Sequence, residues 1–296
     1  MDHKELLASL SDEQRRSLNA KSNGPALVHL AGHTGLLVLL GSLIVIRVPF
    51  WPLLMLPHGV LLVFLFTLQH ETAHETAFAS PMMNKWITRI CGFLIFMPPL
   101  WFRYFHFAHH RHTQDVDNDP ELEDGKPETW RQYVWHVSGL PLWWSLGKTL
   151  FANAMGRGQY VYVPQRAEAK IKLEARILLL LHGTLFAGSL IVGSTILLFV
   201  WVIPTLLGQP FLRLYLLAEH GRCAFVANML ENTRTTYTNR LVRWLAWNMP
   251  FHIEHHTMPT APFHKLPELN ALTREHLKAT SNGYSEFHKE YVETLA

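Results

Sequence analysis

The chain has 296 residues, of which 49% are hydrophobic and 17% are charged, whereas an ordinary soluble domain carries about 25% charged residues. This deficit of charge favours a membrane protein. The formal net charge of +3 is small and the basic residues form no stripe, which argues against nucleic acid as a partner. The two cysteines, Cys91 and Cys223, form no CxxC pair, so neither a disulfide framework nor a thiolate metal site is expected. The 19 histidines, however, exceed what a core of this size requires.

The N-terminal segment is polar and has no early apolar stretch of the kind found in a cleaved secretory signal. Residues 1–24 are therefore predicted to form a cytoplasmic N-terminal arm. Within it, residues 4–18 suit either a short amphipathic helix on the surface or a solvated segment. Residues 25–296 are predicted to form a single membrane domain.

Four apolar segments approach the length of about 20 residues that a helix needs to cross a bilayer. A turn is expected at the PFWP sequence of residues 49–52, another at Gly193-Ser194, and a kink at Pro204. Two shorter apolar stretches, 91–101 and 133–151, suit helices that lie in the membrane interface. The predicted fold is an all-α integral membrane protein with about four transmembrane helices. The predicted spans are about 26–46, 53–70, 175–192 and 195–217.

The distribution of basic residues orients these spans. The loop 71–176 is rich in lysine and arginine, whereas the opposite side offers only Arg47. Because basic loops remain in the cytoplasm, both termini are predicted to be cytoplasmic. A helical cap on that side would carry most of the histidines. Its predicted parts are the metal-site segments 70–174 and 218–266 and a C-terminal tail over 267–296.

Three histidine groups occur where the chain leaves or returns to the predicted cytoplasmic face: HETAH from residue 70, HFAHH from residue 106 and HIEHH from residue 252. On a helix, positions i, i+3 and i+4 share one face, so the imidazoles of each group can converge. Eight imidazoles exceed the roughly four ligands that one zinc ion takes, and imidazole suits iron, copper, zinc and nickel. Two ions that share the set are therefore predicted. The predicted ligands are His70, His74, His106, His109, His110, His252, His255 and His256.

A ninth ligand is expected at His220, at the cytoplasmic end of the fourth span and at the same depth as His70. His112 is offset by two positions from His110 and is predicted to support the site rather than to bind metal. A ligating imidazole usually donates its other N–H to a carboxylate or carbonyl group. The carboxylates predicted to support the ligands in this way are Glu71, Glu219, Glu254 and Asp119.

The acidic segment from Asp115 to Asp124 suggests a hard-cation site at first sight. It lacks the spacing and the closing glutamate of a calcium loop. A surface loop that supports the second histidine group through Asp115 or Asp119 is the preferred interpretation.

The motifs HETAH, HFAHHRHT and NMPFHIEHHTMP resemble the HxxxH, HxxHH and (H/Q)xxHH boxes of the membrane fatty acid desaturase superfamily. The resemblance extends from about residue 66 to residue 266 and includes the order of the boxes and the four spans. It implies that the nine histidines bind two iron ions and that O₂ is a co-substrate. It also implies a lipid or other hydrophobic substrate in the bilayer, and electrons from a separate donor protein of the ferredoxin or cytochrome b5 type.

Two features depart from the acyl-CoA desaturases of that superfamily. Leu216 stands four residues before His220, where those enzymes have an asparagine, and the first box has the short HxxxH form. Both departures favour the bacterial or lipid-acting branch over an acyl-CoA substrate. Asn228, Asn232 and Asn248 are candidates to replace the missing asparagine, and Asn248 is counted among the supporting residues.

The predicted function is the O₂-dependent desaturation of a lipid or fatty acyl chain, with no catalytic residue beyond the metal site. Hydroxylation of a lipid or other alkyl substrate on the same site remains an alternative, because the placement of the substrate carbon decides between the two. The HExxH sequence of residues 70–74 also matches a zinc protease, with Glu71 as the general base. A metal transporter or sensor is a third class, since four histidines fall within predicted spans. These are His29, His33, His58 and His182.

Overall fold

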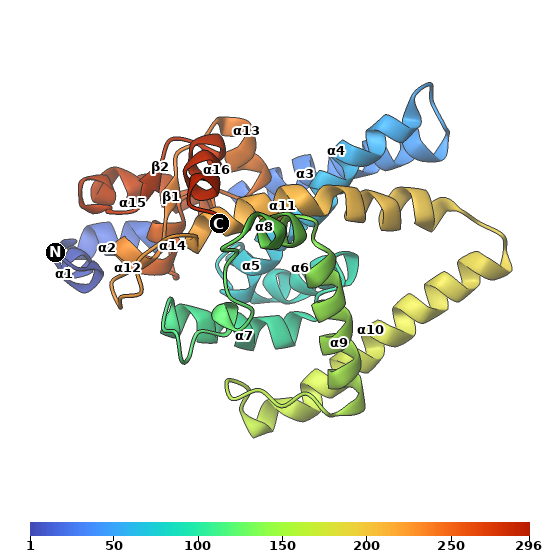
Figure 1. The fold of residues 1–296 in the computed structure, drawn as a ribbon, viewed down its shortest axis with the longest axis horizontal. Coiled ribbons are helices and arrows are strands. Elements are labelled where there is room, and N and C mark those ends of the chain that lie inside the picture. The colour runs from blue at the N-terminus through green and yellow to red at the C-terminus, as the bar shows by residue number, and fades with distance from the viewer.

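The computed structural model describes residues 1–296, which form helices apart from two very short strands (Figure 1). The N-terminal half contains α1 (His3–Ser9), α2 (Asp12–Leu18), α3 (Asn23–Val45), α4 (Trp51–Val63), α5 (Leu65–Ala73), α6 (Pro81–Leu94), α7 (Pro99–His112), η1 (Pro120–Leu122), α8 (Trp130–Val137) and α9 (Leu140–Met155). The C-terminal half contains α10 (Gln165–Ile191), η2 (Leu198–Val202), α11 (Ile203–His220), α12 (Met229–Asn232), β1 (Thr235–Thr236), α13 (Arg240–Leu245), α14 (His252–Thr257), η3 (Phe263–Lys265), α15 (Leu266–Thr273), η4 (Arg274–His276), β2 (Thr280–Ser281) and α16 (Tyr284–Glu293).

Four helical stretches are long and apolar enough to cross a membrane, which confirms the predicted all-α membrane fold. The second stretch is divided into α4 and α5 at Phe64, and the fourth begins with the π-helical segment η2. The turn between the last two spans contains Gly193 in the left-handed region (φ 64°), which glycine adopts without steric cost. The four stretches lie within Asp12–Val45, Trp51–Ala73, Gln165–Ile191 and Leu198–His220.

The spans point away from a cluster of shorter helices. In Figure 1, α3, α4 and α11 run together. The helix α10 diverges from these three and approaches the fourth span at the end of the bundle that is far from the short helices. The helices α1, α2 and α12–α16 gather at the opposite end of the bundle, where both termini also lie. We call this group of helices, together with α7, the cap.

Two glycines allow the backbones of α4 and α11 to approach closely. A Cβ atom on Gly59 of α4 would lie 1.8 Å from the carbonyl oxygen of Pro204, and one on Gly208 of α11 would lie 2.3 Å from the backbone of Gly59. Small residues allow backbones to approach in this way within a membrane. The crossing holds α11, which ends in His220, against the helix that leads to His70.

The predicted kink at Pro204 corresponds to the π-helical segment that precedes it. Proline has no N–H to donate to the carbonyl four residues earlier, which is that of Val200. The Nε2 atom of His58 lies 2.9 Å from this carbonyl oxygen and donates to it. The intramembrane histidine therefore provides a hydrogen bond in place of the N–H that Pro204 lacks.

The other three intramembrane histidines also donate to backbone carbonyls near helix ends or breaks. The Nε2 atom of His33 lies 2.9 Å from the oxygen of Leu61, beside the break at Phe64, and that of His182 lies 3.0 Å from the oxygen of Phe93 near the end of α6. His29 contacts the oxygen of Trp244 at 2.6 Å. Carbonyls in the last turn of a helix have no partner within the helix. Each of the four histidines thus satisfies a separate carbonyl, and they form no shared metal path of the kind that a transporter would need.

The N-terminal residues are packed rather than solvated. Both α1 and α2 begin with a capping box, formed by Asp2 with Glu5 and by Ser11 with Gln14. Leu6, Leu10 and Leu18 are buried. In particular, Leu6 packs in one small cluster with Leu230 and Ile253, and Ile253 lies within the third histidine box. The alternative of a solvated arm over 4–18 is therefore wrong.

The two weaker apolar stretches are each divided between two helices. The stretch 91–101 ends α6 and begins α7, with Phe96 at φ 59° between them. The stretch 133–151 belongs to α8 and α9, which meet at Gly139 (φ 74°). Neither stretch belongs to the four candidate spans.

Candidate metal centre

Four short segments deliver all the predicted ligands to one region of the cap. The first box lies at the end of α5, the second at the end of α7, and His220 is the last residue of α11. The third box forms α14. Seven of the nine histidines are fully buried, and His74 and His110 are partly buried. The fully buried ones are His70, His106, His109, His220, His252, His255 and His256.

The first group contains five histidines whose potential ligand atoms all lie within 4.8 Å of one another. The Nε2 atoms of His74 and His106 are 2.7 Å apart, and those of His110 and His255 are 3.2 Å apart. The ring of His70 lies among the others, with its centroid 4.1 Å from that of His106. The members are His70, His74, His106, His110 and His255.

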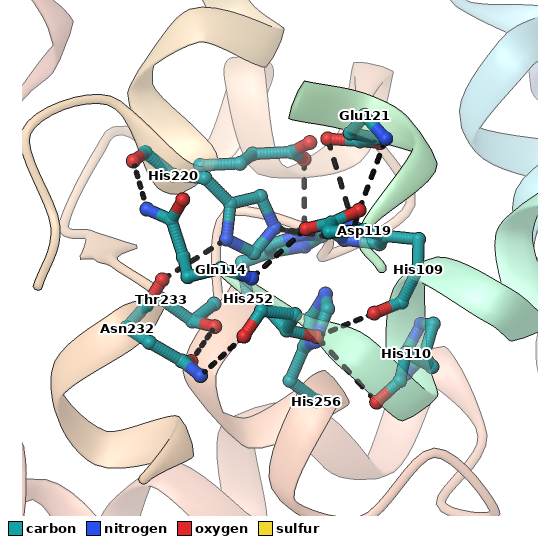
Figure 2. Close-up of polar contacts among 12 residues, drawn as sticks. His109, His110, Gln114, Asp119, Glu121, His220, Asn232, Thr233, His252 and His256 are labelled. Carbon is teal, nitrogen blue, oxygen red and sulfur yellow. Dashed lines mark hydrogen bonds and ion pairs between the residues drawn. The ribbon is translucent and has the colours of Figure 1, made fainter. Parts of the chain in front are cut away.

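The second group surrounds His220. The potential ligand atoms of His109, His220 and His256 lie within 4.8 Å of one another. The Nε2 atom of His252 is 3.2 Å from that of His220, so a fourth imidazole adjoins the group (Figure 2). The Nε2 atom of His109 also lies 3.2 Å from that of His220. The nine predicted ligands are thus divided into sets of five and four.

The nitrogen atoms of these rings suit a pair of bound cations. Burial, followed by repulsion between neighbouring imidazoles, lowers the pKa of His74, His106 and His255 well below its usual value, so these rings are neutral, as metal binding requires. Both ring nitrogens of His70 and the Nε2 of His256 are buried without a hydrogen-bond partner. Buried polar atoms without partners are rare in native proteins. A cation in each group would satisfy one nitrogen of His70 and the Nε2 atom of His256. All-imidazole sets suit iron, zinc or copper.

Two of the carboxylates predicted to support the site lie beside predicted ligands. The Nδ1 atom of His109 donates to Asp119 at 2.9 Å (Figure 2). Glu219 places an oxygen 3.4 Å from the Nδ1 atom of His252. A hydrogen bond such as that from His109 fixes the tautomer and orientation of a ligating ring and leaves its Nε2 atom for the metal. The approach of Glu219 to His252 is not a hydrogen bond, because the Nδ1 atom of His252 has no hydrogen-bond partner.

Two further supporting contacts were not predicted from the sequence. The backbone carbonyl oxygen of Asn232 lies 3.1 Å from the Nδ1 atom of His220. The hydroxyl oxygen of Thr113 lies 3.2 Å from the Nδ1 atom of His256. Gln114 adds a bond from its side-chain amide to the carbonyl of His220 at 2.9 Å. A backbone carbonyl can come from any residue type, so no sequence pattern marks Asn232. Thr113, by contrast, lies only three residues after the last histidine of the second box.

The other four predicted supporting residues contact other groups. Glu71 accepts a bond from the backbone N–H of Phe263 at 2.9 Å, and Asn248 donates to the carbonyl of the same residue at 3.1 Å. His112 is partly exposed and lies 3.8 Å from Asp115. Glu254 accepts bonds from Thr235 and Asn270, both at 2.6 Å. These residues hold the segments around the boxes together and do not touch the ligating rings.

None of the three candidate asparagines presents its side chain to any of the nine predicted ligands. Asn228 accepts a bond from the backbone N–H of His3 at 3.0 Å, and Asn232 donates to the carbonyls of Thr113 and Val226. Leu216 itself packs against the main hydrophobic core. The asparagine of the acyl-CoA enzymes therefore has no counterpart among these residues.

Comparison with known protein families agrees with this arrangement. The model of the fatty acid desaturase family matches residues 47–288, which include all nine histidines. The chain belongs to the fatty acid desaturase family. Its four candidate spans and its histidine clusters agree with membership of this family.

Two curated relatives of this desaturase-family protein are distant. One is the sphingolipid delta(4)-desaturase of Drosophila melanogaster, 25% identical over 219 residues, which is 70% of this chain and 60% of the relative. The other is the sn-1 oleoyl-lipid 12-desaturase of Synechocystis sp. (strain ATCC 27184 / PCC 6803 / Kazusa), 24% identical over 254 residues, which is 77% of this chain and 70% of the relative. The matched region therefore spans less than two thirds of the first relative.

Proposed function

We propose that this protein is an O₂-dependent, di-iron oxidoreductase that introduces a double bond into a lipid or fatty acyl chain. The division of nine imidazoles into adjacent sets of five and four carries the proposal. The names of the two relatives, a sphingolipid desaturase and an oleoyl-lipid desaturase, support a lipid as the substrate class. The nine histidines would be the iron ligands, with Asp119 and Glu219 as supporting residues.

Two bound iron ions would supply the chemistry that activates O₂ and removes hydrogen from an unactivated C–H bond. The protein's own contribution is geometric and electrostatic. Burial excludes water from the ligands, and the bond from His109 to Asp119 holds the proton of the neutral ring on Nδ1, so that Nε2 can face a metal. The crossing of Gly59 and Gly208 holds α11 against α4, which leads to the helix that carries the first box.

The cap would lie on the cytoplasmic side of the membrane, where a ferredoxin or cytochrome b5 type protein would deliver electrons. The far end of the spans is poor in positive charge. Arg47 is the single basic residue of the turn between α3 and α4, and the turn over 192–197 has none. Because basic segments tend to stay in the cytoplasm, this distribution of charge supports a cytoplasmic position for the cap.

Metal analysis of the purified protein in detergent tests the proposal. We expect about two iron ions per chain, and a strong loss of iron in a variant such as His220→Ala that removes a ligand from the second set. Product analysis by mass spectrometry under ¹⁸O₂ then reports the reaction. A loss of two hydrogens without ¹⁸O supports desaturation, whereas ¹⁸O in the product would assign hydroxylation. A single zinc ion per chain would contradict the di-iron site.

A further inference from the structure

An open cavity lies in the cap, outside the histidine clusters. It has a volume of about 620 Å³ and opens between two loops, one after β1 and one after β2. The loop after β1 leads into α13, and the loop after β2 leads into α16. The cavity is lined by Tyr237, Thr238, Asn239, Val242, Asn282, Gly283, Tyr284 and Ser285.

The polar groups in this cavity are hydroxyls and amides, and none of the lining side chains is charged. Thr238 is partly exposed and Asn282 and Ser285 are exposed, so the polar groups of these side chains are open to a ligand. Glu286 lies at the rim and accepts a bond from the backbone N–H of Asn282 at 2.9 Å. Recognition of phosphate or carboxylate usually employs arginine or lysine side chains. The lining therefore suits an uncharged group with hydroxyls of its own.

A short row of side chains links the cavity to the second histidine group. Tyr284, which lines the cavity, packs against Tyr215 of α11 with 5.4 Å between ring centroids. Tyr215 also packs against Phe64 at the break between α4 and α5, at 5.3 Å. Glu219, one helical turn after Tyr215, approaches His252 at 3.4 Å. Few residues thus separate the cavity from a proposed ligand.

The cavity also lies beside the first span. Val242 of its lining belongs to α13, and Trp244 of the same helix stacks on His29 of α3 with 5.3 Å between centroids. The side chain of Leu241 in α13 is 70% exposed. An exposed leucine next to a spanning helix favours contact with the bilayer. A lipid could therefore reach the cavity from the membrane.

We infer that this cavity binds the headgroup of the lipid substrate and that this headgroup is uncharged and bears hydroxyl groups. The inference rests on the proposed function and adds a substrate class to it. Thr238, Asn282 and Ser285 provide the accessible polar groups that recognise the headgroup hydroxyls. A lipid whose headgroup carries a phosphate is disfavoured, because the lining offers no cation and Glu286 lies at the rim.

Equilibrium binding in detergent micelles tests this site with two probes that share one acyl chain, 1-oleoylglycerol and 1-oleoylglycerol 3-phosphate. We expect the unaltered protein to bind the neutral probe about tenfold more tightly. Removal of one hydroxyl, in Thr238→Val or Ser285→Ala, should weaken binding of the neutral probe by about two- to tenfold. Thr195→Val, which alters an exposed threonine at the far end of the spans, is the matched control and should leave binding unchanged.

A charge introduced into the cavity gives a test that misfolding cannot imitate. Asn282→Lys should raise the affinity for the phosphate-bearing probe, whereas Gln165→Lys, at an exposed position outside the cavity, should not. In an oxidation assay, Thr238→Val should raise the concentration of neutral lipid at half-maximal rate and leave the maximal rate unchanged.

The inference is overturned if the phosphate-bearing probe binds as tightly as the neutral one, or if none of the cavity variants changes binding. The binding measurement needs neither O₂ nor an electron donor. A failure of the proposed function would appear separately, as an absence of iron or of oxidised product in the unaltered protein.

Discussion

The Nδ1 atom of His109 lies 2.9 Å from an oxygen of Asp119, and each of the two side chains is 2% exposed. The backbone holds this carboxylate in place, because it accepts bonds from the N–H groups of Gln114 at 2.9 Å and Glu121 at 3.0 Å. Burial opposes the ionisation of Asp119, but the bond to His109 holds its pKa below the usual value. The aspartate is therefore a fixed anion behind one of the proposed ligands.

Replacement of this anion should loosen the metal site. In Asp119→Asn, the neutral amide no longer stabilises the N–H of His109, and iron affinity should fall by about ten- to a hundredfold. Metal analysis after dialysis against a chelator measures the change. Asp117→Asn, in an exposed part of the same loop, is the control. Equal iron retention in both variants would show that Asp119 does not support the site.

The HExxH alternative makes a distinct prediction for Glu71. The carboxylate accepts a bond from the backbone N–H of Phe263, and the oxygen of a glutamine can accept the same bond. Glu71→Gln should therefore keep its metal and most of its oxidation activity. A zinc protease would instead lose nearly all activity with its metal retained, because glutamate is its general base. Parallel assays of metal content and product formation decide between the two readings.

The bond from His58 to the carbonyl of Val200 should contribute to stability rather than to metal binding. His58→Phe leaves the carbonyl beside Pro204 unpaired, which should lower the free energy of unfolding by about 1–3 kcal/mol. Thermal unfolding in detergent measures the loss, and the iron content should stay at the level of the unaltered protein. His58→Gln, whose amide can still donate, should be less destabilised. Loss of iron from His58→Phe while the fold stays intact would contradict this role.

The crossing of α4 and α11 should tolerate no side chain. Gly208→Ala would place a Cβ atom 2.3 Å from the backbone of Gly59, which forces the two helices apart. We expect a marked drop in the unfolding temperature and, because α11 carries His220, a loss of iron. Gly183→Ala in α10 is the matched control, since its Cβ would meet nothing within 4 Å. Equal behaviour of the two variants would mean that the helices can separate without harm.

The pair formed by Arg213 and His136 predicts a dependence on pH. Burial, together with the charges of Arg213 and Lys126, lowers the pKa of His136 to about 3, and the neutral ring accepts a bond from the Arg213 guanidinium at 2.9 Å. In the unfolded chain the ring has its ordinary pKa of about 6.5 and binds a proton more readily. The contribution of His136 to the free energy of unfolding is therefore complete above about pH 6.5. It is lost progressively as the pH falls below about 6.5.

Comparison of unfolding temperatures at pH 7.5 and pH 5 measures this effect. His136→Gln keeps an acceptor for Arg213 but does not titrate, so its unfolding temperature should fall less between the two values. If the unfolding temperature of His136→Gln falls as much between pH 7.5 and pH 5 as that of the unaltered protein, groups other than His136 cause the loss of stability in acid.

The spans and the histidine boxes could be predicted because both depend on local properties. An apolar run of about 20 residues is visible in any window of that length, and the spacing within a box places its imidazoles on one helical face. The boundaries differ from the predictions by several residues, notably for α10, which begins at Gln165 with a charged first half. Composition does not mark where a helix enters the membrane.

The supporting residues were harder to predict because their partners are distant in the chain. Glu71 was expected to contact an imidazole, but it contacts Phe263, which is 192 positions away. Asp119 lies only ten positions from His109, and of the two aspartates considered for this loop it is the one that contacts His109. The burial of Leu6 against Ile253 likewise depends on two chain segments that meet only after folding.

The contact between Leu6 and Ile253 has a consequence for the order of membrane insertion and metal uptake. The helix α14, which carries three of the proposed ligands, has only six residues, and an isolated helix of that length is not stable in water. Leu6 supports it from one side, and the bond from Thr235 to Glu254 holds it from another. The four spans can enter the bilayer before the third box has left the ribosome. Metal uptake would then follow synthesis of the last box, so a nascent or truncated chain could be inserted in the membrane and still lack redox activity.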